Sequence, residues 1–289
     1  PAFTKGELIE QTETDASGRA VLVTDLPNGK YYVKETAPAA GYLLDDKTAL
    51  EIDASYTRQD GEKVLRFEKT FVNLPAETEV RKIDLASSAQ LAGCTLEIIE
   101  EWSGETVLSF QTGEEPERIQ KLQLSDSGQE RIYILRETEP APGYVTAEDL
   151  YFKLEQAGDE EEGLQVETEV YFLQEGEWVH AADHTLVMED DVTKVQISKK
   201  DITTKEELPG ASLELYDEED GSLVEAWVST EEAHYIEKLP AGTYRLVEKK
   251  APEGYGYAED VIFEVKDTGE IQTVEMLDDI QPEEDEPDS

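Results

Sequence analysis

The chain has 289 residues, of which 69 are acidic and 25 are lysine or arginine, so its formal net charge is −44 at pH 7. This charge repels phosphate backbones and anionic lipid surfaces and argues against nucleic-acid binding and membrane association. No apolar run is long enough to cross a bilayer, so we expect no membrane insertion within this segment. The single cysteine, Cys94, cannot form an internal disulfide.

One pattern occurs three times along the chain. In each copy a glutamate comes four residues after a tyrosine, and a Gly-Tyr pair follows six residues later, which is typical of a strand that ends in a turn. The three copies are Tyr31–Glu35 with Gly41-Tyr42, Tyr133–Glu137 with Gly143-Tyr144, and Tyr244–Glu248 with Gly254-Tyr255.

The first unit, residues 1–75, is the shortest of three predicted domains. It contains the first copy of the pattern and closes at Asn73, but it has no Lys-x-Asp segment at its start. We therefore expect this unit to begin in the middle of a domain.

The second and third units both open and close alike. The second, residues 76–191, opens with Lys82-Ile-Asp84 and closes with Met188-Glu-Asp190; the third, residues 192–279, opens with Lys199-Lys-Asp201 and closes with Met276-Leu-Asp278. The second unit is longer because it carries an acidic, hairpin-like insert between Gly158 and Gly176. Residues 280–289 are strongly acidic and predict a solvated tail or linker.

The runs between turns alternate apolar and polar residues, and no long amphipathic helix is evident. Turn sequences such as Asp217-Glu-Glu-Asp-Gly221 separate these runs. The sequence therefore predicts an all-β, elongated protein with one antiparallel β-sandwich per unit, arranged in tandem.

Strand parity predicts that three ionisable side chains in each complete unit point inward, because residues two apart lie on the same face of a strand. Lys82 shares its face with Val80, and Asp190 shares its face with Met188. Parity gives the same prediction for Glu137 and for the third-unit residues, which are Lys199, Glu248 and Asp278. Burial of such groups in charged form is costly.

These motifs resemble the B-repeat (Cna-B-like) domains of collagen adhesins, also called SpaA-type pilin or prealbumin-like domains, of Gram-positive surface proteins. The resemblance implies an isopeptide bond between a lysine of the first strand and an aspartate or asparagine of the last, assisted by the glutamate. Carried over by position, the bonds would join Lys82 to Asp190 and Lys199 to Asp278. The assisting residues would be Glu137 and Glu248. The first unit offers Glu35 and Asn73 without a lysine partner, so we expect no bond there.

Burial also explains why these residues suit such a reaction. Desolvation favours a neutral amine, which is a nucleophile, and a protonated carboxyl group, which is an electrophile. The glutamate can transfer protons between them, so each unit would modify itself once and would not be an enzyme. The alternative is a buried ion pair that never reacts.

The resemblance implies a structural stalk of a cell-surface adhesin or pilin-like protein. Such a protein is extracellular and anchored to the cell wall through regions outside this segment, and its partners are other domains of the same protein. The rival hypothesis is a module that binds a host or matrix protein or glycan directly, through an apolar patch on the insert around Tyr171, Phe172 and Trp178. No cofactor or metal site is indicated, since the three histidines lack metal-ligand spacing.

Two further points stay open in the sequence. Asp190 is followed by Asp191, and Asp278 by Asp279, so the acceptor in each unit is ambiguous; parity with the methionines favours the first of each pair. Cys94 occupies the place of Ala211 in the third unit, which favours a small core residue over a reactive thiol.

Overall fold

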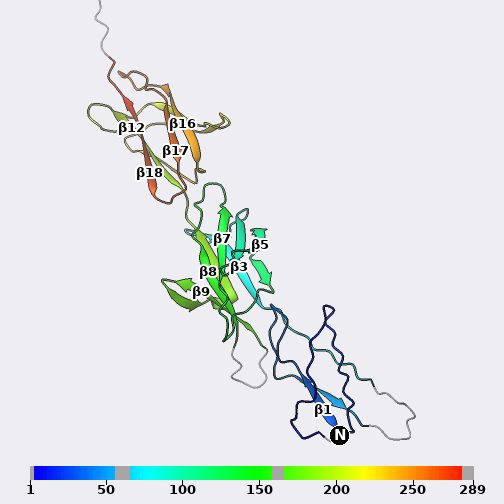
Figure 1. Ribbon diagram of the computed structural model, residues 1–289. Helices are drawn as coiled ribbons and strands as arrows, with labels where there is room; N and C mark the ends of the chain where they lie inside the picture. The colour runs from blue at the N-terminus through cyan, green and yellow to red at the C-terminus, as the bar shows by residue number, and fades with distance from the viewer. Residues whose placement is uncertain (1–2, 56–65, 158–165, 282–289) are drawn as a thin grey trace, which may run out of the picture.

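The computed structural model describes residues 3–55, 66–157 and 166–281. It shows three bodies in a row, with the first unit at the N-terminal end and the third at the other (Figure 1). Apart from one short 3-10 helix, η1 (Ala182–His184), the regular structure of the described residues is entirely β. The predicted fold class, an all-β chain with β-sandwich units in tandem, is confirmed.

The second unit is a sandwich of two sheets. The six-stranded sheet has the order β10-β9-β8-β7-β4-β5, and the three-stranded sheet has the order β11-β3-β6. The strands are β3 (Glu77–Asp84), β4 (Thr95–Glu100), β5 (Thr106–Gln111), β6 (Glu117–Gln120), β7 (Tyr133–Glu139), β8 (Leu150–Gln156), β9 (Thr168–Gln174), β10 (Glu177–His180) and β11 (Thr185–Asp190).

The third unit repeats this plan without the hairpin β9–β10. Its four-stranded sheet has the order β14-β13-β16-β17, and its three-stranded sheet has the order β15-β12-β18. The strands are β12 (Lys194–Asp201), β13 (Ser212–Asp217), β14 (Leu223–Val228), β15 (His234–Glu237), β16 (Gly242–Lys250), β17 (Val261–Val265) and β18 (Ile271–Asp278).

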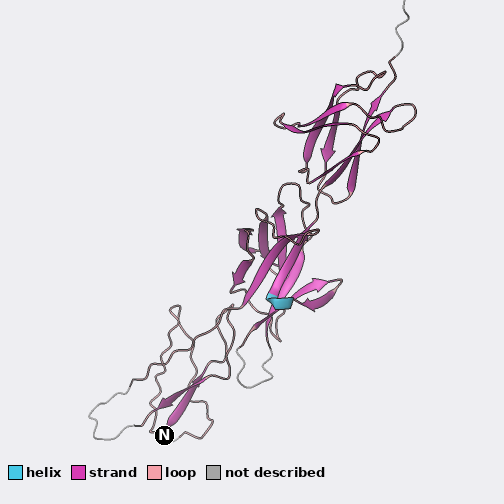
Figure 2. Ribbon diagram, turned by 180° about the vertical axis from the view of Figure 1, so that it is seen from behind, coloured by secondary structure: helices cyan, strands magenta, loops and turns pink. Residues whose placement is uncertain are grey.

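One pair of strands in each of these units is parallel. The last strand lies beside the first, β11 on β3 and β18 on β12, while the other ladders are antiparallel. The chain therefore enters a unit at one end and leaves it at the other, and the strands lie roughly along the row of units, as Figure 2 shows. The sequence analysis did not predict this parallel pairing.

Apolar side chains fill the space between the two sheets of each unit. Leu96, Leu135 and Phe152 are among those buried in the second unit, and Leu213, Leu215 and Leu246 in the third. The side chains that alternate with them face solvent, which is the pattern from which the strands were predicted.

The described part of the first unit holds a single antiparallel pair, β1 (Lys30–Lys34) with β2 (Ala49–Asp53). The segment that ends at Asn73 corresponds in position to β11 and β18, and no strand of the described residues pairs with it. Part of the acidic insert of the second unit, residues 158–165, lies outside the described residues, and the rest forms the hairpin β9–β10. No helix among the described residues is long and apolar enough to span a membrane.

Candidate functional site: two buried lysine–carboxyl clusters

The second and third units each bury one lysine and two carboxyl groups between their sheets. In the second unit Lys82 comes from β3, Asp190 from the neighbouring β11, and Glu137 from β7 of the opposite sheet. All three side chains are fully buried. The parity prediction that they point inward is therefore confirmed.

Lys82 lies between the two carboxyl groups of its cluster. Its Nζ donates a hydrogen bond to Oδ1 of Asp190 and lies 3.4 Å from Oε1 of Glu137. The other glutamate oxygen, Oε2, accepts a hydrogen bond from the backbone N–H of Ala147 at 2.7 Å. This backbone bond fixes the glutamate so that its Oε1 faces the lysine.

The third unit repeats the arrangement atom for atom. Nζ of Lys199 donates to Oδ1 of Asp278 and lies 3.2 Å from Oε1 of Glu248. Oε2 of Glu248 accepts the backbone N–H of Ala258 at 2.8 Å. Two units with different surrounding sequences thus hold the same three groups in the same geometry.

The parallel ladder brings lysine and aspartate together across neighbouring strands. Lys82 is level with Met188 on β11, and Asp190 is two residues further along, on the same face. The third unit has the same register, with Lys199 level with Met276. A shift of one residue would turn one of the partners to the opposite face of the sheet.

Burial changes the acid strength of the aspartates. Desolvation raises the pKa of Asp190 to about 7, and it also raises the pKa of Asp278, although the adjacent lysine works against this in both units. The charge of the glutamate on the opposite sheet raises both pKa values further. A protonated, electrophilic carboxyl group is therefore accessible near neutral pH.

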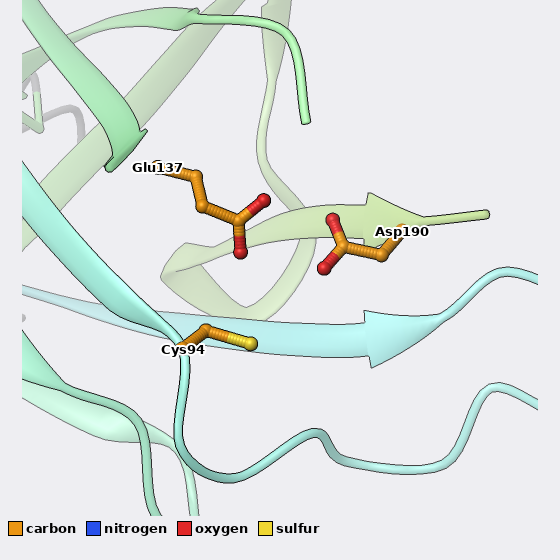
Figure 3. A group of neighbouring side chains, drawn as sticks. All are labelled: Cys94, Glu137 and Asp190. Carbon is orange, nitrogen blue, oxygen red and sulfur yellow. The ribbon is translucent and has the colours of Figure 1, made fainter. Parts of the chain in front are cut away.

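The two carboxyl groups of a cluster face one another (Figure 3). Oδ2 of Asp190 and Oε1 of Glu137 are buried and have no hydrogen-bond partner among the described residues, and the same holds for Asp278 and Glu248. Charged carboxyl oxygens are costly to bury without hydrogen bonds. The arrangement can instead hold protons and exchange them with the amine, which is what general acid–base catalysis requires.

Cys94 adds a thiol to the cluster of the second unit (Figure 3). Its Sγ and one oxygen each of Glu137 and Asp190 lie within 4.8 Å of one another, so these three groups could ligate a metal ion. However, Lys82 already contacts both carboxyl groups, and burial raises the pKa of the thiol, which disfavours the thiolate that metals prefer. We therefore interpret Cys94 as a packed core residue.

The structure places the first aspartate of each pair beside the lysine. Asp191 instead forms an ion pair with Lys194 at 2.7 Å, and Asp279 is exposed.

In the first unit the two corresponding residues also meet. Nδ2 of Asn73 donates a hydrogen bond to Oε1 of Glu35 at 2.7 Å. No lysine of the described part of the chain forms an ion pair with this glutamate.

Sequence reasoning gave no role to the aspartate of the Lys-x-Asp motif. Oδ2 of Asp84 accepts a hydrogen bond from the hydroxyl of Tyr144 at 2.7 Å, and Asp201 accepts one from Tyr255 at 2.8 Å. These tyrosines belong to the repeated Gly-Tyr pairs, so the fixed recurrence of both motifs in the second and third units was the signal that could have linked them.

The aromatic residues of the insert are partly covered. Lys153 lies over the rings of Tyr171 and Trp178, with its Nζ 5.9 and 4.8 Å from their centroids. Phe172 packs against the core of the second unit. A hollow of about 330 Å³ lies beside it, lined partly by Arg81 and Asp183.

Comparison with known proteins identifies a family. The model of the SpaA prealbumin-like fold domain matches residues 3–64 and 193–280, which together exceed half of the chain. No curated protein matches the sequence.

Several solved structures are similar to the chain. The Bacillus anthracis TIE protein is 25% identical over 88% of this chain, with a TM-score of 0.43. A streptococcal ancillary pilin is 19% identical over 89% of this chain and 76% of its own, with a TM-score of 0.33. The shaft pilin SpaA from Lactobacillus rhamnosus GG is 16% identical over 72% of this chain and 98% of its own, with a TM-score of 0.29. The chain spans 42% of the length of the TIE protein.

Proposed function

The chain belongs to the family of SpaA prealbumin-like fold domains, and from this we propose that it is a segment of a Gram-positive cell-surface stalk. The stalk segment has three such domains, residues 1–75, 76–191 and 192–279, followed by an acidic tail. Its role is structural: it holds other parts of the same surface protein away from the cell, and it has no enzymatic turnover. Its position is extracellular, with attachment to the wall through regions outside this segment.

The second and third domains lock themselves with isopeptide bonds, Lys82 to Asp190 and Lys199 to Asp278. The observation that carries this proposal is the buried lysine held against an aspartate in both domains, with a glutamate 3.2–3.4 Å from the same nitrogen. A stable buried ion pair would need more hydrogen bonds than these carboxyl groups have.

The reaction balances as a condensation. The neutral amine of Lys82 attacks Cγ of protonated Asp190 and forms a C–N bond, and the glutamate takes the proton that the nitrogen releases. Glu137 then delivers this proton to the departing oxygen, so a C–O bond breaks and water leaves. The product is an uncharged amide, which removes two charges from the core. No external reagent is needed.

The rival function, direct binding of a host or matrix ligand by the insert, receives less support. Its aromatic side chains are covered by Lys153 or packed against the core, so the described part of the insert offers no broad apolar patch of the kind that marks a protein-binding surface.

The mass of the purified, denatured chain tests the proposal. We expect a mass lower than that of the sequence by two water molecules, with cross-linked peptides that pair Lys82 with Asp190 and Lys199 with Asp278. An unmodified mass would contradict the self-locking mechanism and leave two buried ion pairs. A loss of ammonia mapped to Asn73 would contradict the prediction that the first domain forms no bond.

A further inference from the structure

The two joints between successive units are built from the same parts. In the joint between the first and second units, the backbone N–H of Ala76 donates to the carbonyl of Gly41 at 2.9 Å, and that of Lys121 donates to the carbonyl of Ala76 at 2.8 Å. Nζ of Lys121 lies 5.4 Å from the centre of the Tyr42 ring.

The joint between the second and third units has the same bonds. The N–H of Thr193 donates to the carbonyl of Gly143 at 3.1 Å, and that of Lys238 donates to the carbonyl of Thr193 at 3.0 Å. Nζ of Lys238 lies 4.6 Å from the centre of the Tyr144 ring. The ring thus contacts a cation across both joints.

Both joints need a glycine on one side and an unusual lysine on the other. Gly41 and Gly143 are buried, and a Cβ at either position would collide with the carbonyl group of Lys121 or Lys238. Both lysines adopt left-handed backbone conformations, with φ of 67° and 61°. Such a conformation is uncommon for a residue other than glycine, and its recurrence at two joints indicates a shared requirement.

The second joint adds a carboxylate for the ammonium group. Nζ of Lys238 donates to the hydroxyl of Tyr144 at 2.6 Å and to Oδ2 of Asp84 at 3.3 Å. The hydroxyl in turn donates to the same Oδ2. Ring, hydroxyl and carboxylate together form a site for one lysine ammonium.

The far end of the third unit carries one half of this joint. Gly254 has φ +86°, its carbonyl accepts the N–H of Gln281 at 2.9 Å, and Tyr255 donates to Asp201 as Tyr144 does to Asp84. The bond from Gln281 to Gly254 is the counterpart of the bond from Thr193 to Gly143 in the second joint. No described residue supplies the lysine.

This end face is open. A Cβ on Gly254 would meet nothing within 4 Å, and the glycine is exposed. Ile280 is 60% exposed, whereas Val192, its counterpart in the second joint, is 9% exposed. The third unit thus presents to solvent an apolar residue that the second unit covers with its neighbour.

We propose that the end face formed by Asp201, Gly254, Tyr255 and Ile280 docks a further SpaA-like domain that carries a lysine. That domain places a left-handed lysine against Gly254, with its ammonium between the Tyr255 ring and Asp201. The inference deepens the proposed stalk role but does not depend on the isopeptide bonds.

Residues 282–289, which follow this end face, contain no lysine. The first unit of a second copy carries Asp25 in the corresponding place, before Leu26-Pro27, where the third unit has Lys238 before Leu239-Pro240. Asp25 would bring a carboxylate toward Asp201, so the partner is a lysine-bearing domain and not a second copy of this chain.

An extended chain tests the docking directly. A copy of residues 193–281 is joined after Ser289, so that residues 282–289 act as a tether that raises the effective concentration of the added domain. The added domain carries either the lysine equivalent to Lys238 or an aspartate in its place. Distances between spin labels on the third unit and on the added domain report docking. Equal melting temperatures of the lysine form and the aspartate form of the added domain would show that both forms fold.

We expect a narrow distance distribution with the lysine and a broad one with the aspartate, with the docked population falling about tenfold or more. Gly254→Ala should abolish docking, whereas Gly221→Ala, at another positive-φ glycine of the third unit (φ +73°) with open space around it, should not. Broad distributions with both added domains, or equally narrow ones, would overturn the proposal. Neither result would change the outcome of the mass measurement that tests the isopeptide bonds.

Discussion

At the scale of single residues, the second and third units place an amine and two carboxyl groups where water does not reach. Glu137 differs from its neighbours on β7 because a backbone N–H holds one oxygen and leaves the other facing Lys82. Its position across the sandwich, on the opposite sheet, lets it contact both partners without belonging to their ladder. We infer that it transfers the proton and is not consumed.

Replacement of this glutamate should block the bond in its own unit only. For Glu137→Gln we expect a mass lower than that of its own sequence by one water molecule and not by two, because a glutamine cannot accept the amine proton. The third unit should still lose its water. Glu139→Gln, on the same strand but exposed, is the matched control and should leave the mass change intact. A loss of two water molecules from the Glu137→Gln chain would rule out proton transfer by Glu137.

The unreacted site should also leave a pH signature. Burial raises the pKa of Asp190 to about 7, above its ordinary value of about 3.9, so between these values the folded state holds a proton that the unfolded state has lost. Unfolding then releases a proton, and stability falls as pH rises from about 4 to about 7. In the reacted chain Asp190 is an amide and no longer titrates.

Glu137→Gln removes one cause of the raised pKa of Asp190, the charge of Glu137, but leaves the largest cause, desolvation. We therefore expect the second unit of Glu137→Gln to lose stability with rising pH above about pH 4 more steeply than the parent, by at most ~1.4 kcal/mol per pH unit. Urea unfolding at several pH values measures the slopes. The remaining acids are common to both chains, so equal slopes would contradict the assignment of Asp190.

At the scale of elements, the first and last strands of each complete unit lie side by side and parallel, with the proposed bond between them. In the third unit this bond would close a loop of 79 residues. By analogy with disulfides of similar span, it should contribute roughly 3–5 kcal/mol to the stability of the unit.

Two adjacent lysines on β12 allow a matched test. Lys199→Met removes the bond and leaves Asp278 and Glu248 without their partner, so we expect the third unit to lose roughly 3–5 kcal/mol in denaturant unfolding. Lys200→Met removes an ion pair with Glu275 on the solvent face and should cost less than about 1 kcal/mol. Similar losses for both variants would contradict a covalent tie.

The strands and their inward faces could be predicted because burial in a strand follows a two-residue period. Met188 and Asp190 on β11 show this period, as do Val80 and Lys82 on β3. It did not predict the parallel pairing of β3 with β11, which depends on where the chain returns after more than a hundred residues. Nor did it predict the joints. Lys121 and Lys238 share the segment Ile-x-Lys-Leu, but this short pattern does not indicate that they lie beside Gly41 and Gly143.

At the scale of the whole molecule, the joints determine how one unit follows the next. Gly143→Ala should disturb the joint between the second and third units, because the added Cβ collides with the backbone of Lys238. Gly254→Ala is the control: its φ of +86° is close to the +83° of Gly143, but it has open space around it.

Both variants should lose about 1 kcal/mol for the strained backbone. Only Gly143→Ala should change the small-angle X-ray scattering profile of the chain, toward a broader range of angles between units. An unchanged profile would show that the joint does not hold the two units in line.

The proposed bond between the first and last strands also determines whether a protease can separate the two ends of a unit. Every loop of the second unit between β3 and β11 lies inside the ring that an amide between Lys82 and Asp190 would close. A single cut in any of these loops would open the ring without separating the two ends of the unit, so the material attached on either side would remain joined. A surface protein built this way could be nicked at its exposed turns and still keep its full length.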